Sequence, residues 1–251
     1  QSKDARIRLL LSLSANLKVT DWLTLQARGN LDYSADKLRQ KFYASTATAL
    51  CGMNGRYIEM DYQETQMYGD VMAMVKKQLN DFTLDVAIGG SINDRITNST
   101  RIDSKNASLK YANVFNLANI VMSSSASIDQ KIDAHYQLQS LFATAQIGYK
   151  EGVFLDLTAR NDWSSTLAYT KYEKKGFFYP SAGVSFLPNK WVKMPEWVSF
   201  SKLRGAYSIV GNGVPPFITY PVSYVTAGGE ILASDAAPFA EMKPEMTHSV
   251  E

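Results

Sequence analysis

Three charged residues, Asp156, Arg160 and Asp162, lie at even positions of one segment in which apolar residues occupy odd positions. Side chains at alternate positions of an extended strand point to the same face, so the three charges are predicted to share one side. Opposite charges so placed can bind a polar ligand, contact a second polar domain, or simply neutralise one another in a hydrated wall. The same alternatives apply to three further charged residues: Arg28, Asp32 and Asp85.

The composition offers few of the residues that catalysis and metal binding require. Only two histidines occur, His135 and His248, which excludes multi-histidine metal sites and most histidine-based triads. The single cysteine, Cys51, cannot form a disulfide within the chain. No segment carries a distinctive acid/base carboxylate pair or a glycine-rich phosphate loop. The sequence therefore predicts no enzyme, no catalytic or metal-binding residue and no cofactor.

Length and charge narrow the class of protein further. The chain has 251 residues, and 45% of them are hydrophobic, enough for a folded domain. Lysine and arginine total 26 against 24 acidic residues, and no basic block stands out, so a nucleic-acid partner is not expected. No window approaches the roughly 20 apolar residues of a transmembrane helix. The aromatic content of 12% without such a window indicates a β-rich chain.

The hydrophobic pattern of the sequence has a period of two, which is typical of β-strands. Strands are therefore the elements that must position the charged residues. Apolar residues occupy odd positions over 7–19, pause at the turn 20–22, and resume over 23–33. This pattern predicts two long strands joined by a short turn. Similar runs cover 57–76, 82–92, 141–149, 153–159, 177–187 and 200–211, and a ninth strand begins near Glu245. We therefore predict an all-β, antiparallel sheet of about 8–9 strands.

The length of the runs favours a membrane barrel over a soluble sheet. Soluble strands average about 5–6 residues, whereas tilted membrane strands need about 9–11. The connections also alternate: 20–22, 77–81 and 150–152 are short, whereas 35–56, 94–136, 164–176 and 212–244 are long. Outer-membrane barrels have short periplasmic turns and long extracellular loops. The connection 188–199 is the exception, because it is long on the predicted periplasmic side.

The four tryptophans fall near the ends of these predicted strands. Trp22, Trp191 and Trp197 lie in or beside predicted periplasmic connections, and Trp163 lies at a predicted extracellular end. Aromatic girdles at both membrane interfaces have this distribution. Packing at the ends of a soluble core would also accommodate them.

Several segments carry a family resemblance. They are LFATAQIGYK at 141–150, LDLTARNDWSSTL at 155–167, FYPSAGVSF at 178–186, KLRGAYSIVGNG at 202–213 and MKPEMTHSVE at 242–251. In this order they resemble the barrel of SusC/RagA-type TonB-linked (TonB-dependent) outer-membrane transporters. The resemblance covers roughly 138–251, and Met242 stands where the family usually has leucine.

The resemblance implies a bacterial outer-membrane barrel of roughly 22 strands with a plug inside it. It also implies import of a bulky glycan or peptide, driven by TonB and assisted by a SusD-like surface lipoprotein. We expect residues 1–251 to be part of the TonB-dependent receptor β-barrel domain, a wall segment in contact with outer-membrane lipid. The plug and the remaining strands would lie outside this sequence.

Aromatic residues of the long loops are the candidates for contact with substrate or the lipoprotein. The alternative for each is ordinary packing of one loop on another. These residues are Tyr43, Tyr111, Phe115, Phe217, Tyr220 and Tyr224.

Two other architectures fit parts of the pattern. A surface-attached β-sandwich adhesin or lectin would also alternate apolar and polar residues along its strands. A small autonomous porin-like barrel could close with eight strands. The sandwich would bury its apolar face against a second sheet, and the small barrel would pair its first strand with its last.

Overall fold

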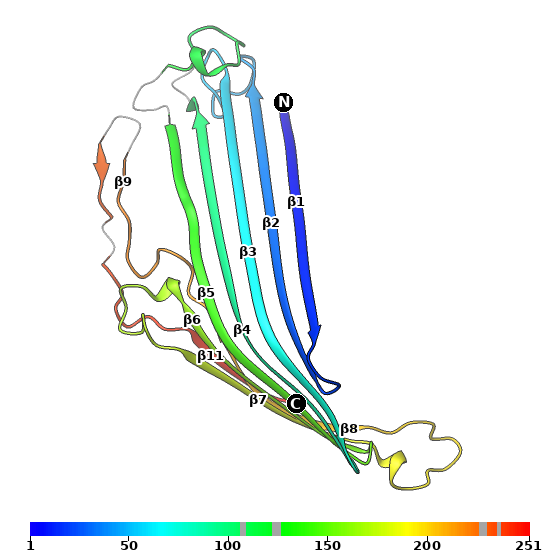
Figure 1. Cartoon of the computed structure of the whole chain (residues 1–251). Helices are drawn as coiled ribbons and strands as arrows, with labels where there is room; N and C mark the ends of the chain where they lie inside the picture. Colours follow the sequence, from blue (N-terminus) through cyan, green and yellow to red (C-terminus); the bar gives the residue numbers. More distant parts are fainter. Residues whose placement is uncertain (106–108, 122–126, 226–229, 235–236) are drawn as a thin grey trace.

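The computed structural model describes residues 1–251 except 106–108, 122–126, 226–229 and 235–236. Nine strands form one curved antiparallel sheet in the order β1-β2-β3-β4-β5-β6-β7-β8-β11 (Figure 1). Consecutive strands are neighbours throughout, as in an up-and-down meander. The predicted all-β, antiparallel fold is therefore confirmed.

The strands are long in the first part of the sheet and shorter in the second. They are β1 Ser2–Lys18, β2 Leu23–Phe42, β3 Arg56–Leu79, β4 Phe82–Asp103, β5 Ser127–Tyr149, β6 Val153–Ser164, β7 Phe177–Phe186, β8 Leu203–Asn212 and β11 Glu245–Val250. A two-residue hairpin, β9 Tyr224–Val225 with β10 Ile231–Leu232, lies in the connection before β11. Among the described residues, single-turn 3₁₀ helices occur in three connections: η2 Leu117–Asn119, η3 Ser165–Leu167 and η4 Pro188–Lys190.

One face of the sheet is apolar and uncovered. Leu11 lies opposite Leu31 and Leu13 opposite Gly29, so the odd-numbered residues of β1 and β2 share this face. Leu13 remains 78% exposed. The few fully buried apolar side chains of the described residues belong to the loops or to strand ends beside them: Cys51, Tyr57, Ile58, Leu109, Ile120 and Leu167. A second sheet packed on the apolar face is absent from the described residues, so the sandwich alternative finds no support. No helix among these residues is long and apolar enough to cross a membrane.

The strands extend further than the alternation predicts. Loops were expected from residues 35 and 94, but β2 continues to Phe42 and β4 to Asp103. Beyond the apolar band, both faces of a strand meet polar surroundings, which are water or hydrated headgroups. The hydrophobic alternation therefore stops there, although the backbone hydrogen bonds between strands continue. Cross-strand ion pairs occupy these extensions, including Arg39 Nη2 with Glu59 Oε1 at 2.8 Å. The long loops are correspondingly shorter than expected.

The short turns gather at one end of the sheet, which we call the turn end. Asn80, Lys150 and Glu151 adopt positive φ angles of 51°, 48° and 51°, as tight hairpin turns require. The connection 187–202, which is long at this end as predicted, also lies here, opposite the large loops (Figure 1). We call the opposite end, with the large loops, the loop end.

Aromatic rings collect at the turn end. Phe82 and Tyr149 have ring centroids 4.8 Å apart, and Trp191 lies 5.6 Å from Tyr149. The Trp191 indole lies so close to Gly152 that a β-carbon added there would be 1.8 Å from its Nε1. Glycine at 152 therefore lets the long connection fold back onto the β5–β6 turn. Trp191 then lies at the turn end, where the sequence predicted it beside the periplasmic membrane interface.

The sheet has two open edges. Within the described part of the chain, β1 pairs only with β2 and β11 only with β8. A small barrel closed by pairing of the first and last strands is thus not formed, and the autonomous-barrel alternative finds no support. Bare edge groups in hydrocarbon cost several kcal/mol each, so both edges require partner strands in a membrane.

Candidate functional site

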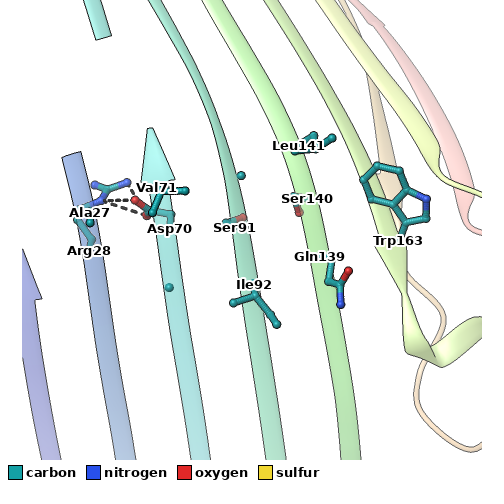
Figure 2. A pocket seen from close by; sticks show the side chains of 12 residues that line it. Ala27, Arg28, Asp70, Val71, Ser91, Ile92, Gln139, Ser140, Leu141 and Trp163 are labelled. Atoms are coloured by element: carbon teal, nitrogen blue, oxygen red, sulfur yellow. Dashed lines mark hydrogen bonds and ion pairs between the residues drawn. The ribbon is translucent and has the colours of Figure 1, made fainter. Parts of the chain in front are cut away.

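A row of polar residues crosses five neighbouring strands on the face opposite the apolar one. The register places Arg28, Asp70, Ser91, Ser140 and Asp162 in succession on β2, β3, β4, β5 and β6. Figure 2 shows the first four of these side chains along one line across the strands. We call these five residues the polar row.

The strongest interaction of the polar row joins Arg28 to Asp70. The Arg28 Nε lies 3.1 Å from both carboxylate oxygens of Asp70, and its Nη2 lies 2.9 Å from Oδ2. The Asp70 side chain is fully buried, whereas that of Arg28 is 43% exposed. The guanidinium therefore supplies the donors that the buried carboxylate would otherwise obtain from water.

At the other end of the polar row, the structure joins two of the three sequence-predicted charges. Arg160 Nε donates to Asp162 Oδ1 at 2.7 Å, and its Nη2 donates to Ser140 Oγ at 2.8 Å. Asp156 is separate from this pair and accepts a hydrogen bond from Gln146 Nε2 at 2.6 Å. The shared face is as predicted, and contact of these three residues with a ligand stays a prediction.

Similar pairs continue over the same face. Arg8 Nη2 lies 2.6 Å from Asp32 Oδ2, Lys76 Nζ lies 3.0 Å from Asp85 Oδ2, and Arg95 Nη2 lies 2.7 Å from Glu64 Oε2. Arg28, Asp32 and Asp85 are therefore all in ion pairs, whereas Asp156 has the neutral partner Gln146. The face is thus a hydrated wall of paired charges, suited to a water-filled lumen.

The opposite side of the sheet at the same position carries no charge. Gly69 and Gly90 leave a shallow hollow among Val71, Ile92, Leu141 and Trp163 on the apolar face. Trp163 lies at the loop-end border of this apolar surface beside Leu141 (Figure 2). Its position matches the interfacial role predicted for it.

At the loop end, two connections fold together into a compact structure that we call the loop knob, residues 43–55 and 109–121. Its core is formed by Tyr57 from β3 with Leu109 and Ile120. Asn54 Nδ2 donates to the carbonyl of Leu109 at 2.8 Å and so ties the first connection to the second. Asn119 Nδ2 donates to the carbonyls of Tyr111 and Val114 at 2.8 and 2.7 Å. The knob therefore has a defined shape held by amide–backbone hydrogen bonds.

An ion pair fixes the base of the loop knob, beyond the end of the apolar band. Arg56 Nε and Nη2 donate to the two Asp103 carboxylate oxygens at 2.8 and 2.7 Å, and Arg101 Nη2 adds a third donor at 2.9 Å. Burial alone would raise the pKa of Asp103, but hydrogen bonds from Arg56 and the Lys105 backbone, with the two positive charges, outweigh it and hold the pKa below its ordinary value.

Three of the predicted loop aromatics belong to the loop knob. Tyr43 and Phe115 pack edge to face with ring centroids 5.0 Å apart, so they contact each other as the ordinary packing alternative expects. Tyr111 is 72% exposed and offers its ring to the exterior. The buried thiol of Cys51 lies 3.5 Å from the Tyr43 carbonyl oxygen within the same knob.

The other three lie in a second group of loops. Tyr220 packs against Tyr169 with centroids 4.7 Å apart, and Phe217 has a positive φ of 63° in an exposed turn. Tyr224 lies in β9, opposite Leu232 of β10. All six predicted aromatics thus fall at the loop end, and their role in binding stays a prediction.

The described residues contain no group of three or more His, Cys, Asp and Glu side chains that could hold a metal ion. Sequence reasoning missed the central part of the polar row, Asp70 and Ser140. Asp70 interrupts an otherwise apolar stretch beside Val71, which is the only local signal. Its partner Arg28 lies 42 positions away and is found only through the strand register.

Comparison with known proteins agrees with this geometry. The family profile described as "TonB dependent receptor-like, beta-barrel" matches residues 1–251. A solved structure of the RagAB peptide transporter shares 18% identity with a TM-score of 0.80, covering 99% of this chain and 28% of that one. The RagAB peptide importer in its "open-open" and "closed-closed" states gives TM-scores of 0.73 and 0.72 at 18% identity, with full or 99% coverage of this chain and 26% of each importer chain. No curated protein matches.

The apolar outer face, polar inner face and segregated loops define a wall segment of a bacterial outer-membrane β-barrel. The chain belongs to the TonB-dependent receptor-like β-barrel family, a family of outer-membrane transporters and not of enzymes. The predicted TonB-dependent barrel is thereby confirmed, and the chain shares the fold of the RagAB structures, as its resemblance to SusC/RagA-type transporters predicts. The chain spans about 28% of the length of the RagAB chain that it matches with the highest TM-score above.

Proposed function

We propose that the protein containing this chain imports a bulky polar nutrient through the barrel lumen, and that this nutrient is a peptide. The polar row carries the proposal, since it lines one face with paired charges and hydroxyl groups across five strands. Such a surface can exchange hydrogen bonds with peptide groups as they pass. The likeness to structures described as a peptide transporter and a peptide importer favours peptides over glycans.

Residues 1–251 would form part of the TonB-dependent receptor β-barrel domain. The open edges of β1 and β11 support this division, since each needs a further strand in the membrane. A plug and further strands would come from elsewhere in the polypeptide, and the plug side would engage TonB. The inner face of the segment would then meet the plug or the water around it.

A SusD-like surface lipoprotein is the proposed partner at the loop end. The loop knob supports this assignment, since it has a fixed shape yet leaves Met53 87% exposed and Tyr111 72% exposed. Exposed apolar and aromatic groups on a rigid support are typical of protein interfaces. Tyr43, Phe115, Phe217, Tyr220 and Tyr224 complete the proposed loop surface for partner or substrate. The apolar face would contact outer-membrane lipid.

A glycan remains the second candidate substrate because of one observation. Tyr169 and Tyr220 form an exposed aromatic pair at the loop end, with 69% and 49% of each residue exposed. Flat aromatic surfaces of this kind can stack on sugar rings. Asp156, Arg160 and Asp162 would serve either substrate from the lumen face.

Uptake by whole cells tests the proposal. A strain lacking the gene for the full-length protein and its complemented parent would be given labelled peptides of about ten residues, or a labelled oligosaccharide of similar mass. We expect peptide uptake to fall at least tenfold on deletion and to return on complementation. A matched strain lacking TonB should show the same loss.

Uptake of the oligosaccharide alone would overturn the peptide assignment in favour of the glycan. If uptake of both solutes is independent of the gene, the import proposal itself is wrong.

A further inference from the structure

Four cationic side chains gather at the loop end of β1 and β2 on the apolar face. We call them the outer basic cluster: Lys3, Lys37, Arg39 and Lys41. Lys3 lies directly opposite Arg39 in the strand register, and Lys37 lies opposite Ala5. All are at odd positions, in phase with Leu9, Leu11 and Leu13, so they share the lipid-facing side and not the lumen side.

Along β1 and β2 toward the loop end, the outer basic cluster follows directly after the last apolar residues. Ile7 pairs with Ala35 and Leu9 with Tyr33, and the next outward positions toward the loop end are Ala5 and Lys37. Four residues separate Tyr33 from Lys37, about 13 Å along a strand. The loop end is extracellular in this family of barrels, so the cations begin at the headgroup level of the outer leaflet with Lys37 and continue outward from it.

Positive charge is in excess within the cluster. Arg39 Nη2 is paired with Glu59 Oε1 at 2.8 Å, but Lys37 Nζ is 3.7 Å from Asp61 Oδ1, too far for a hydrogen bond. Lys3 has no ion-pair partner within the part of the chain that the structure describes. The Lys37 side chain is 61% exposed and that of Arg39 51%. The Lys3 ammonium is therefore available to an external anion, and that of Lys37, held only by the longer ion pair with Asp61, can also turn toward one.

Two strands described further along the sheet, β4 and β6, have no cation at the loop-end border of the apolar face. Above Ile92 of β4 the next outward residue is Asp94, which accepts a hydrogen bond from Gln137 of β5 at 3.1 Å. Above Ala159 of β6 it is Asn161. The basic charge of β1 and β2 is thus not repeated on β4 and β6, as it would be in a general belt of interfacial lysines.

We propose that the outer basic cluster binds the phosphate of a phosphorylated glycolipid in the outer leaflet. The acyl chains of this lipid would lie along Ile7, Leu9 and Leu11, which remain exposed on β1. A soluble anion would gain nothing from this aliphatic surface. A phosphorylated lipid would pair its phosphate with the cations and its acyl chains with the apolar side chains of β1. Cationic groups near a membrane surface each add appreciably to the binding of anionic headgroups. The inference rests on the outer-membrane location and is independent of the transported substrate.

The test uses the full-length protein purified in a nonionic detergent and titrated with purified lipid A, with bound lipid counted by native mass spectrometry. In the Lys3→Gln/Lys37→Gln variant we expect the apparent Kd to rise about tenfold or more. Neither lysine donates a hydrogen bond to a described residue, so the fold should be kept. Lys37→Gln alone should give a smaller rise, and Lys3→Arg/Lys37→Arg should bind as the wild type does.

The matched control is Lys18→Gln/Lys76→Gln, which removes the same charge from the lumen face near the turn end. It should leave lipid A binding unchanged, and dephosphorylated lipid A should bind the wild type about tenfold more weakly. Equal weakening by the control and test variants would reduce the effect to net charge and overturn the proposal. Undiminished binding of the dephosphorylated lipid, or of lipid A to Lys3→Gln/Lys37→Gln, would also overturn it.

Discussion

Replacing Leu13 with arginine should destabilise the assembled barrel by about 2–4 kcal/mol, because a guanidinium near the middle of the apolar band must leave water for hydrocarbon. Leu13 lies opposite Gly29 and is 78% exposed on the apolar face, so no neighbouring side chain would shield the charge. Guanidinium unfolding of the full-length protein in phospholipid vesicles, followed by tryptophan fluorescence, measures the change.

Ser12→Arg is the matched control for Leu13→Arg. Ser12 belongs to the same strand and lies opposite Asn30, but it faces the polar side. There the guanidinium would remain hydrated, so the expected cost is below about 1 kcal/mol. Equal destabilisation by the two substitutions would contradict the assignment of one face to lipid and the other to the lumen.

Arg28→Ala should cost about 2–3 kcal/mol, the second of the large effects. It would leave the Asp70 carboxylate fully buried without its guanidinium partner. Breaking a buried ion pair costs about 3–5 kcal/mol, and the value is reduced here because 43% of the Arg28 side chain is exposed. The same unfolding assay applies.

Two further variants separate the ion pair from simple truncation. Arg28→Ala/Asp70→Ala removes the stranded charge, so it should recover more than half of the stability lost in Arg28→Ala. Arg8→Ala breaks a more exposed pair with Asp32 and should cost less than about 1 kcal/mol. If the double variant loses as much stability as Arg28→Ala and Asp70→Ala lose when added together, the Arg28–Asp70 pair is not coupled as described.

Much of the wall could be predicted from sequence because the membrane imposes a period of two on strands that cross it. The alternation through Leu9, Leu11 and Leu13 and the short turn at 20–22 fixed both the face and the direction of the first two strands. The ninth strand near Glu245 was also found, and it forms β11. These features depend on local residue order alone.

The alternation of apolar and polar residues did not predict strands beyond the membrane-spanning part of the sheet. Between residues 94 and 103 polar residues occupy both faces, so the continuation of β4 to Asp103 had no hydrophobic signal. The small hairpin of β9 and β10 was likewise not predicted, because the loop that contains it shows no alternation of apolar and polar residues. Pairing of strands by backbone hydrogen bonds depends on neighbours that are distant in sequence, which one segment cannot reveal.

The candidate site was predicted less completely for the same reason. Arg160 and Asp162 are two residues apart, so their ion pair could be expected from strand geometry alone. Asp70 was missed because its partner is on another strand. Tyr43 and Phe115 were correctly placed in loops, but only their tertiary contact shows that they pack together.

The orientation of the two ends of the sheet in the outer membrane tests the central claim most directly. Single cysteines would be placed at Tyr111 in the loop knob and at Glu151 in the turn between β5 and β6, with Cys51 replaced by serine in the full-length protein. A membrane-impermeant thiol reagent should label position 111 in intact cells and position 151 only after the outer membrane is permeabilised. Labelling of both positions in intact cells, or of position 151 alone, would contradict a wall segment that spans the membrane with its loops outside.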